Sequence, residues 1–438
     1  MKPTETETPI GGLPFKSRRR PLIVKKFGGT SVANIDRIRR IARLALESQR
    51  EGNDVVVVVS AMSGETDRLL KLAHQVLPLP EGREMDVIAA TGEQVTVALT
   101  ALAIQAEGGK SSSFLGHQLP VITDSAFTRA RIQCVEQGPI REALARGQIA
   151  VVAGFQGVDP RNNITTLGRG GSDTTAVAVA AALGADVCEI YTDVEGVFTA
   201  DPRVCPAGSK LKSIPYEEML ELASLGAKVL QVRSVEIAMK YNVPVHVRSS
   251  FSDEEGTLIV PRDKMLESRR LMGLACEKGQ VRVELIGAEC RPGLVAELTY
   301  LLADLNVSVD MLCHSRGAVE NPRADISFTL PEGELRRAQP SLEQFLGKLG
   351  ATGLQISTDL AKVTLVGIGL RSDPGIAARL CRSLTQQGIH VSGLSVNELR
   401  ISCLVESGAA DRAICILHET FELAGEAPAE PLASATPA

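Results

Sequence analysis

An uninterrupted apolar run after Asp54 constrains the fold more than any other stretch of the sequence. Residues 55–59 are five consecutive valines. A strand without polar alternation must be buried on both faces, as in a parallel sheet covered by helices. Further apolar strands are expected at "LIVKKFGGT", "LPVIT", "IAVVAGF", "VCEIYTDV" and "VPVHVRSS", with helical patterns between them. The sequence therefore predicts an α/β domain with a mainly parallel sheet over residues 21–262.

An internal repeat follows this domain and predicts a second fold. Shifted by 82 positions, Gly287 meets Gly369, and Pro292–Gly293 meets Pro374–Gly375. Each copy reads strand, Pro-Gly turn, amphipathic helix, strand and second strand, so we expect two βαββ modules. Their predicted limits are 266–350 and 351–424. Residues 1–20 and 425–438 are expected to be a leader and a tail without fixed structure.

The composition excludes several classes of function. A net charge of −5, 3% aromatic residues and no tryptophan argue against a nucleic-acid partner. The nine cysteines form no C-x-x-C pair, which indicates reduced thiols in the cytoplasm rather than disulfides or a zinc site. No apolar run approaches the ~18 residues of a membrane helix, so no membrane association is expected.

Glycine and hydroxyl residues follow several predicted strands. Gly28 and Gly29 end the first strand, and Ser60 ends the valine strand. Glycines let backbone N–H groups approach an anion, and a following helix N-terminus favours negative charge. Lys25 and Lys26 lie on opposite faces of a strand, so only one can face such a site. An ordinary strand–helix turn explains each segment equally well when it is taken alone.

The segment "TTLGRGGSDTTA", residues 165–176, carries both charges. Arg169 offers a planar fork that matches a carboxylate or phosphate, and Asp173 can orient a lysine or accept from an amine. Helix capping explains Ser172 or Asp173, but not an arginine between glycines. The segment favours a substrate with both charges, such as an amino acid. Glu93, which the pattern places at a helix start, is either a cap or the receptor of an ammonium group.

The loop "IYTDVEGVFTADPR" suits a nucleotide. Thr192 and Asp193 can bind a ribose edge, Phe198 a base and Arg203 a phosphate. A surface turn is the alternative, because Asp, Gly and Pro also form turns.

Five segments together resemble the aspartate kinase family, within the amino-acid kinase fold. They are "VKKFGGTSVAN", "VVSAMSGETD", the stretch from "TTLGRGGSDTTA" to "TADPR", "EEMLELASLGAKVLQVRSVEIA" and "VPVHVRSS". The repeated modules resemble that family's paired, ferredoxin-like ACT domains. The resemblance implies an open, mainly parallel sheet sandwiched by helices. It also implies phosphorylation of the β-carboxylate of L-aspartate by ATP, the first step toward lysine, threonine and methionine.

The resemblance assigns roles by motif. Lys26, Asp173 and Arg169 would be catalytic: Lys26 would neutralise charge on the transferring phosphoryl group, and Asp173 would orient that lysine. The implied aspartate site comprises Ser60, Thr66, Glu93, Phe155, Arg169, Gly170, Gly171 and Ser172. The implied nucleotide site comprises Lys26, Gly28, Gly29, Thr192, Asp193, Phe198, Arg203 and Lys228. Mg²⁺ would be held mainly by phosphates and water, without protein ligands. A carboxylate acceptor is already nucleophilic, so no general base is needed.

The effector site of this family, which binds threonine or lysine between ACT modules, departs here from the usual pattern. Asp-Lys before the first Pro-Gly turn is replaced by Cys290 and Arg291, and Gln-Asn by His314 and Ser315. Ser-Thr-Ser-Glu becomes "SVNE", which includes Val396, Asn397 and Glu398. A hydrogen bond lost from a buried effector costs about 1–3 kcal/mol. We therefore expect weakened or altered feedback inhibition.

Assembly and activity leave alternatives open. The open sheet edges of ACT modules predict a homodimer or larger assembly. An internal start at Met265 or Met272 would give a separate regulatory subunit, although any chain contains methionines. The alternative functions are another amino-acid kinase, acting on glutamate, acetylglutamate, carbamate or UMP, and a regulatory amino-acid-binding protein with an inactive kinase half.

Overall fold

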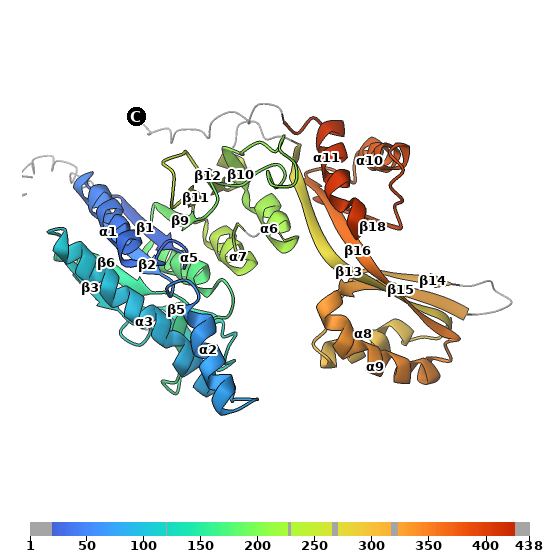
Figure 1. Cartoon of the computed structure of the whole chain (residues 1–438), viewed down its shortest axis with the longest axis horizontal. Helices are drawn as coiled ribbons and strands as arrows, with labels where there is room; N and C mark the ends of the chain where they lie inside the picture. Colours follow the sequence, from blue (N-terminus) through green and yellow to red (C-terminus); the bar gives the residue numbers. More distant parts are fainter. Residues whose placement is uncertain (1–19, 120, 227–228, 265–269, 317–322, 425–438) are drawn as a thin grey trace, which may run out of the picture.

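The computed structural model describes residues 20–119, 121–226, 229–264, 270–316 and 323–424 (Figure 1). The expected tail, Lys228, Met265 and all but the last residue of the expected leader lie outside these ranges. A helix-covered sheet domain occupies one side of Figure 1, and a second domain with long, curved strands occupies the other.

An eight-stranded sheet forms the centre of the first domain. Its order is β10-β12-β11-β9-β1-β2-β6-β3, and all neighbours run parallel except β11 and β12. The strands are β1 (Leu22–Phe27), β2 (Asp54–Val59), β3 (Ser111–Phe114), β6 (Ile149–Ala153), β9 (Val187–Thr192), β10 (Ser213–Pro215), β11 (Val245–Ser249) and β12 (Thr257–Val260). The prediction of a mainly parallel sheet is confirmed.

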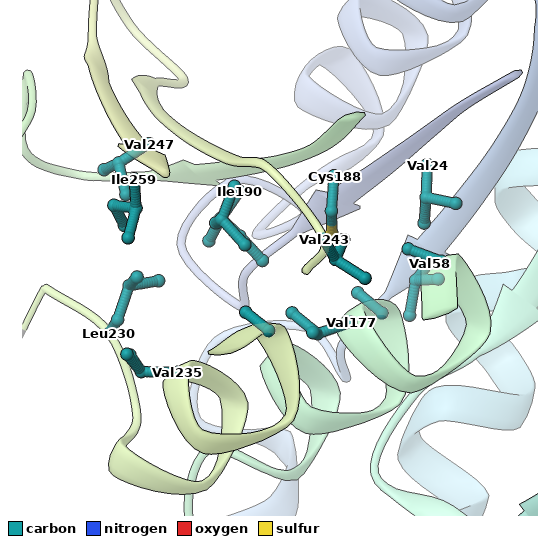
Figure 2. Packing of buried hydrophobic residues seen from close by; sticks show 14 of the residues in the cluster. Val24, Val58, Val177, Cys188, Ile190, Leu230, Val235, Val243, Val247 and Ile259 are labelled. Carbon is teal, nitrogen blue, oxygen red and sulfur yellow. The ribbon is translucent and has the colours of Figure 1, made fainter. Parts of the chain in front are cut away.

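Helices bury both faces of this sheet. Val55, Val57 and Val59 pack with α1 (Ile35–Arg50) and α3 (Gly82–Ala106). Val56 and Val58 belong to the opposite core, with α4 (Gly138–Ala145), α5 (Gly171–Leu183), α6 (Tyr216–Ser224) and α7 (Val232–Tyr241). Figure 2 shows part of that core, where sheet residues such as Val24 and Ile190 face Val177 and Val235. Both faces exclude water, which explains why the valine run has no polar alternation.

A four-stranded sheet lies beside the large one, in the order β5-β4-β7-β8. Its strands are β4 (Val121–Thr123), β5 (Ile132–Val135), β7 (Gln156–Val158) and β8 (Ile164–Thr166). The strand expected at "LPVIT" belongs here and not to the parallel sheet. A hydrogen bond of 2.6 Å between the Thr123 and Thr165 hydroxyls joins its strands. This sheet holds the segment that leads to Arg169.

One described helix, α3, is long and apolar enough to cross a membrane. It contacts α1 and α2 (Glu65–Val76) and buries the charged residues Asp86 and Glu93. Those contacts are typical of a core helix in a globular domain.

The second domain is built on one six-stranded sheet, in the order β14-β15-β13-β16-β18-β17. Its strands are β13 (Leu271–Glu289), β14 (Asp310–Arg316), β15 (Arg323–Pro331), β16 (Gly353–Gly367), β17 (Gly393–Val396) and β18 (Arg400–Glu406). Its helices are α8 (Leu294–Asp304), α9 (Glu332–Leu349), α10 (Pro374–Gln386) and α11 (Ala410–Thr420), with short 3-10 turns at Arg262–Lys264 and Ser407–Ala409.

The internal repeat has a structural cause. Gly287 and Gly369 both adopt left-handed backbone conformations, with φ of +61° and +66°, which a side chain would strain. The helices bury equivalent positions: Leu294, Leu298 and Leu302 in α8, and Ile376, Leu380 and Leu384 in α10. Two modules of the predicted βαββ order are therefore present.

The two modules share their long strands. Residues 282–286 of β13 pair with residues 353–357 of β16, beside the first module's helices. Residues 271–278 of β13 pair with residues 361–367 of β16, beside those of the second. Each module thus obtains its fourth, ferredoxin-like strand from the other copy of the repeat. The domain limits 266–350 and 351–424 stay a prediction. They describe the two copies of the sequence repeat, whereas the six-stranded sheet continues from one copy into the other.

The second module also packs on the first domain. The Leu274 N–H donates to the Thr199 carbonyl at 2.7 Å, and the Thr199 hydroxyl contacts His418 Nε2 at 2.9 Å. Ala200 and Cys205 belong to the hydrophobic core of the second module. The segment after β9 therefore contacts both domains.

Candidate active site

Four adjacent strands, β9, β1, β2 and β6, end at one edge of the large sheet. The Ser60 N–H donates to the Phe27 carbonyl at 3.1 Å, and the Gly154 N–H to the Val59 carbonyl at 2.9 Å. These bonds continue the sheet to the turns that the sequence singled out. Ligand sites of open α/β sheets lie at this carboxyl edge.

Lys26 and Asp173 form an ion pair at this edge. Lys26 Nζ lies 2.5 Å from Asp173 Oδ1, and the two side chains are 10% and 13% exposed. Lys25 points to the other face, where its Nζ lies 2.5 Å from Glu189 Oε2. The alternation of the strand thus leaves Lys26 as the lysine of this edge.

Close backbone approach explains the glycines around Lys26. A Cβ on Gly28 would lie 3.3 Å from Lys26 Nζ, and one on Gly29 would lie 3.2 Å from the Ala61 carbonyl. Gly170 has φ of +69°, and a Cβ there would overlap the Gln231 side chain. Side chains at these positions would close the space beside the ion pair.

Glu93 is a buried carboxylate in the middle of α3. The expectation that it begins a helix is wrong, because α3 begins at Gly82. Its Oε1 accepts the Ala61 N–H at 3.0 Å, whereas Oε2 is buried without a hydrogen-bond partner. Burial raises the pKa of Glu93 to about 7. A buried carboxylate oxygen without a partner is the counterpart that a ligand ammonium requires.

Phe155 adopts a strained backbone at the end of β6. Its φ is +69°, a left-handed value that costs a bulky residue about 1–3 kcal/mol. The Phe155 N–H donates to Thr175 Oγ1 at 3.1 Å, and a Cβ on Gly171 would lie 2.8 Å from the Phe155 ring. Helix α5 therefore holds Phe155 against the start of the glycine-rich segment. Buried Ser172 packs on Gly154 in the same contact region.

Asp86 anchors this region and was missed by the sequence analysis. Its carboxylate accepts the Thr166 hydroxyl at 2.6 Å, the Thr166 N–H at 2.8 Å and the Thr128 N–H at 2.9 Å. Burial raises its pKa despite these bonds. Asp86 is seven residues before Glu93, so the two acidic residues share one face of the helix. This spacing is visible in the sequence and could have identified Asp86. Arg169, three residues after Thr166, is exposed.

Of the residues expected to bind the nucleotide, Thr192 and Asp193 lie at the carboxyl edge of the large sheet, whereas Phe198 and Arg203 lie farther along the following loop. The Thr192 hydroxyl donates to Asp193 Oδ1 at 3.1 Å, at the end of β9 and next to β1. Phe198 is half-buried and forms a β-bridge with Lys210. The Arg203 side chain is 84% exposed and makes two bonds to Asp201, of 3.0 and 2.7 Å. Thr66 is half-buried near the start of α2.

The expected effector residues fall in two groups, one at β14 and the end of β13, the other at the end of β17 and in the turn after it. His314 and Ser315 lie on β14, where the Ser315 hydroxyl donates to the Asp325 carbonyl at 3.2 Å, and Cys290 follows β13. Val396 ends β17, the Asn397 N–H donates to the Arg400 carbonyl, and the Glu398 carbonyl accepts from Leu370. β14 and β17 are the two ends of the strand order.

Comparisons with known proteins agree with this architecture. Residues 21–249 match the amino acid kinase family, and residues 363–421 match an ACT domain. The chain is 46% identical to the aspartokinase of Mycolicibacterium smegmatis, over 92% of this chain and 97% of the relative. It is 45% identical to the aspartokinase of Pseudomonas aeruginosa, over 93% of this chain and 98% of the relative.

Solved structures show the same fold. The aspartate kinase from Synechocystis is 40% identical with a TM-score of 0.51, over 92% of this chain and 69% of that chain. E. coli aspartokinase III in complex with aspartate and ADP has a TM-score of 0.75 at 24% identity, over 92% of this chain and all of that chain. On the strength of the near-complete match to the curated relatives, this chain belongs to the aspartokinase family.

Proposed function

We propose that the protein transfers the γ-phosphoryl group of ATP to the β-carboxylate of L-aspartate and forms 4-phospho-L-aspartate. The observation that carries this assignment is Glu93. Its unpartnered, buried oxygen lies beside Ala61, at the strand edge that also holds the Lys26–Asp173 pair. A zwitterionic substrate needs both an anion to receive its ammonium and cations to receive its carboxylates.

Aspartate is proposed to bind with its ammonium on Glu93 Oε2. Arg169, between two left-handed glycines, and Ser172, at the start of α5, are proposed to hold the carboxylates. Ser60, Thr66, Phe155, Gly170 and Gly171 would line the remaining surface. Arg169 is exposed, so it can turn toward a carboxylate without breaking a buried contact.

ATP is proposed to bind across β9 and β1. Gly28 and Gly29 would present backbone N–H groups to the phosphates, with Thr192, Asp193, Phe198, Arg203 and Lys228 around the nucleoside. Arg203 must leave Asp201 to reach a phosphate. That pair is exposed, and exposed ion pairs contribute only about 0–1 kcal/mol.

Mg²⁺ is proposed to enter with the nucleotide. No group of three His, Cys, Asp or Glu side chains within the described ranges could hold a metal ion. Mg²⁺ prefers phosphate oxygens and water, so we expect the ion to be bound chiefly to ATP. When bound, the ion neutralises charge on the phosphates.

The proposed reaction is an in-line displacement. The aspartate β-carboxylate oxygen bonds to the γ-phosphorus while the bond to the β,γ-bridging oxygen breaks, and ADP leaves. Lys26 Nζ offsets the charge that develops on the phosphoryl oxygens, and Asp173 fixes its position. Catalysis then rests on positioning and charge stabilisation.

An ADP-release assay tests this function. We expect turnover with L-aspartate and much less with glutamate, acetylglutamate, carbamate or UMP. Lys26→Ala should lower kcat by orders of magnitude while the protein stays folded. A preference for one of the other acceptors would assign another amino-acid kinase. The absence of turnover with every acceptor would favour a regulatory protein with an inactive kinase half.

Regulation and assembly form a second part of the proposal. We propose a cytoplasmic enzyme that assembles as a homodimer or larger through the outer strands β14 and β17, with or without a separate regulatory subunit. We also propose that threonine or lysine inhibits it weakly, because the residues around Cys290, His314 and Val396 depart from the family pattern. Inhibition assays with each effector and with both test this, and strong inhibition at sub-millimolar concentration would contradict it.

A further inference from the structure

A pocket of about 490 Å³ lies beside the glycine-rich segment, away from the Lys26–Asp173 pair. It is lined by Ala126, Arg129, Arg131 and Arg233. Arg233, near the start of α7, donates from Nη1 to the Leu167 carbonyl at 2.7 Å and from Nη2 to the Ala130 carbonyl at 2.8 Å. A side chain that lines the pocket is therefore hydrogen-bonded to the segment that carries Arg169, two residues after Leu167.

The pocket concentrates positive charge, and no carboxylate pairs directly with its arginines within the described ranges. In the part of the chain that the structure describes, Arg129, Arg131 and Arg233 form no ion pair, and no acidic residue lines the pocket. Asp124 is near, but its Oδ1 already accepts the N–H groups of Ala126 at 3.2 Å and Arg131 at 3.0 Å. Burial and the charge of Arg131 lower the pKa of Arg233, while Glu236 and Asp124 oppose that shift.

The walls of the pocket are held in place before any ligand binds. The Ala130 N–H donates to the Thr166 carbonyl at 2.9 Å, and Asp86 binds the N–H groups of both Thr128 and Thr166. A Cβ on Gly168 would lie only 3.0 Å from the Thr128 carbonyl, so the two segments touch. A preorganised site loses less conformational freedom on binding.

We propose that this pocket binds a small multivalent anion of the phosphate class, either inorganic phosphate or the phosphate group of an organic phosphate. Guanidinium groups match phosphate oxygens in pairs, and several positive charges in one pocket are best offset by a ligand with more than one negative charge. Aspartate is a poor fit, because its ammonium would meet arginines and no carboxylate. The active site differs in this respect, since Glu93 supplies that carboxylate.

Calorimetric titration of the full chain with inorganic phosphate tests the proposal. Nucleotide is left out, because ADP is itself an organic phosphate, and chloride keeps the ionic strength constant. We expect phosphate to bind the wild type and to bind Arg131→Gln at least tenfold more weakly. Arg129→Gln, also an exposed position, should weaken binding similarly. Arg146→Gln, an exposed arginine at the end of α4, is the matched control and should bind like the wild type.

Equal phosphate affinity in Arg131→Gln and Arg146→Gln would overturn the proposal, since it would place the anion elsewhere. No binding above that of chloride would overturn it as well. A parallel titration with glycerol 3-phosphate identifies the source of the anion. Tighter binding than inorganic phosphate supports an organic phosphate, and equal binding supports recognition of the phosphate group alone.

Discussion

Replacing Glu93 by Gln should abolish tight aspartate binding and also change the stability of the free protein. The substitution keeps an acceptor for the Ala61 N–H but removes the charge from the oxygen that has no partner. Breaking a buried charge pair costs about 3–5 kcal/mol, so the KM for aspartate should rise by roughly 10²-fold to several 10³-fold. The KM for ATP should stay within about twofold, because ATP is proposed to bind at β1 and β9.

The raised pKa of Glu93 adds a pH dependence with a definite sign. With a pKa of about 7 in the folded protein, the carboxyl is about a tenth ionised at pH 6 and about nine tenths at pH 8. Since only the carboxylate binds an ammonium, kcat/KM for aspartate should rise about tenfold over that range. In Glu93→Gln this rise should vanish.

Stability should respond in the opposite direction. The pKa of Glu93 in the folded state lies above the ordinary glutamate value of about 4.5, so the native state binds the proton more tightly and loses stability as pH rises from 4.5 to 7. Relative to wild type, Glu93→Gln should gain about 2–3 kcal/mol in unfolding free energy between pH 5 and pH 8. Urea denaturation at both pH values measures this difference.

Glu107→Gln, an exposed position at the end of the same helix, is the matched control. It should change neither the KM for aspartate nor the pH dependence of stability. A Glu93→Gln variant with a KM within threefold of wild type would refute the assigned role. If the difference in unfolding free energy between Glu93→Gln and wild type did not vary with pH, the raised pKa of Glu93 in the folded protein would be refuted.

Three further predictions concern the site and its supports. Asp173→Asn should lower kcat by roughly 10²–10⁴-fold at saturating substrates, because Lys26 loses its charged partner; a kcat within twofold of wild type would contradict this. Asp86→Asn should lower the unfolding free energy of the first domain by about 1–3 kcal/mol, measured in urea, and raise the KM for aspartate. The reason is that the Asn side-chain NH₂ cannot accept the N–H groups of Thr128 and Thr166, which now bind the carboxylate. An unchanged unfolding midpoint would count against this prediction. Arg400 and Glu221, 3.3 Å apart and about a quarter exposed, should show a coupling of ~1 kcal/mol in a double-mutant cycle, and strictly additive effects would rule out their contribution to domain docking.

Patterns within one element predicted much of this fold. The valine run specified a strand buried on both faces, and the structure divides its side chains between two cores. Asn34 caps α1 from within the local sequence, since its side chain accepts the Arg37 N–H. The position of Gly287 and Gly369 in the repeat follows from their shared left-handed backbone. These features depend on local geometry, which the residue order contains.

Features that depend on contacts between distant segments were predicted less well. The pattern around Glu93 suggested a helix start, but α3 begins at Gly82 and includes Gly92, where a Cβ would approach that of Ala61 to 2.8 Å. The strand at "LPVIT" was expected, yet alternation of strands and helices does not say which sheet a short strand joins. Asp86 went unnoticed because its partners, Thr128 and Thr166, lie far along the chain.

The exchange of strands between the two βαββ modules has a consequence for synthesis on the ribosome. Leu271 finds its partner, Gly367, only after about a hundred more residues have been translated, which takes roughly 5–20 s at typical rates. Until then, residues 271–278 offer an unpaired, largely apolar edge, and the second module cannot close its sheet. A chain that began at Met272 would keep almost all of this strand, whereas a cut at 350 would leave both modules incomplete. A regulatory subunit made from an internal start would thus be a complete folding unit, and half of it would not.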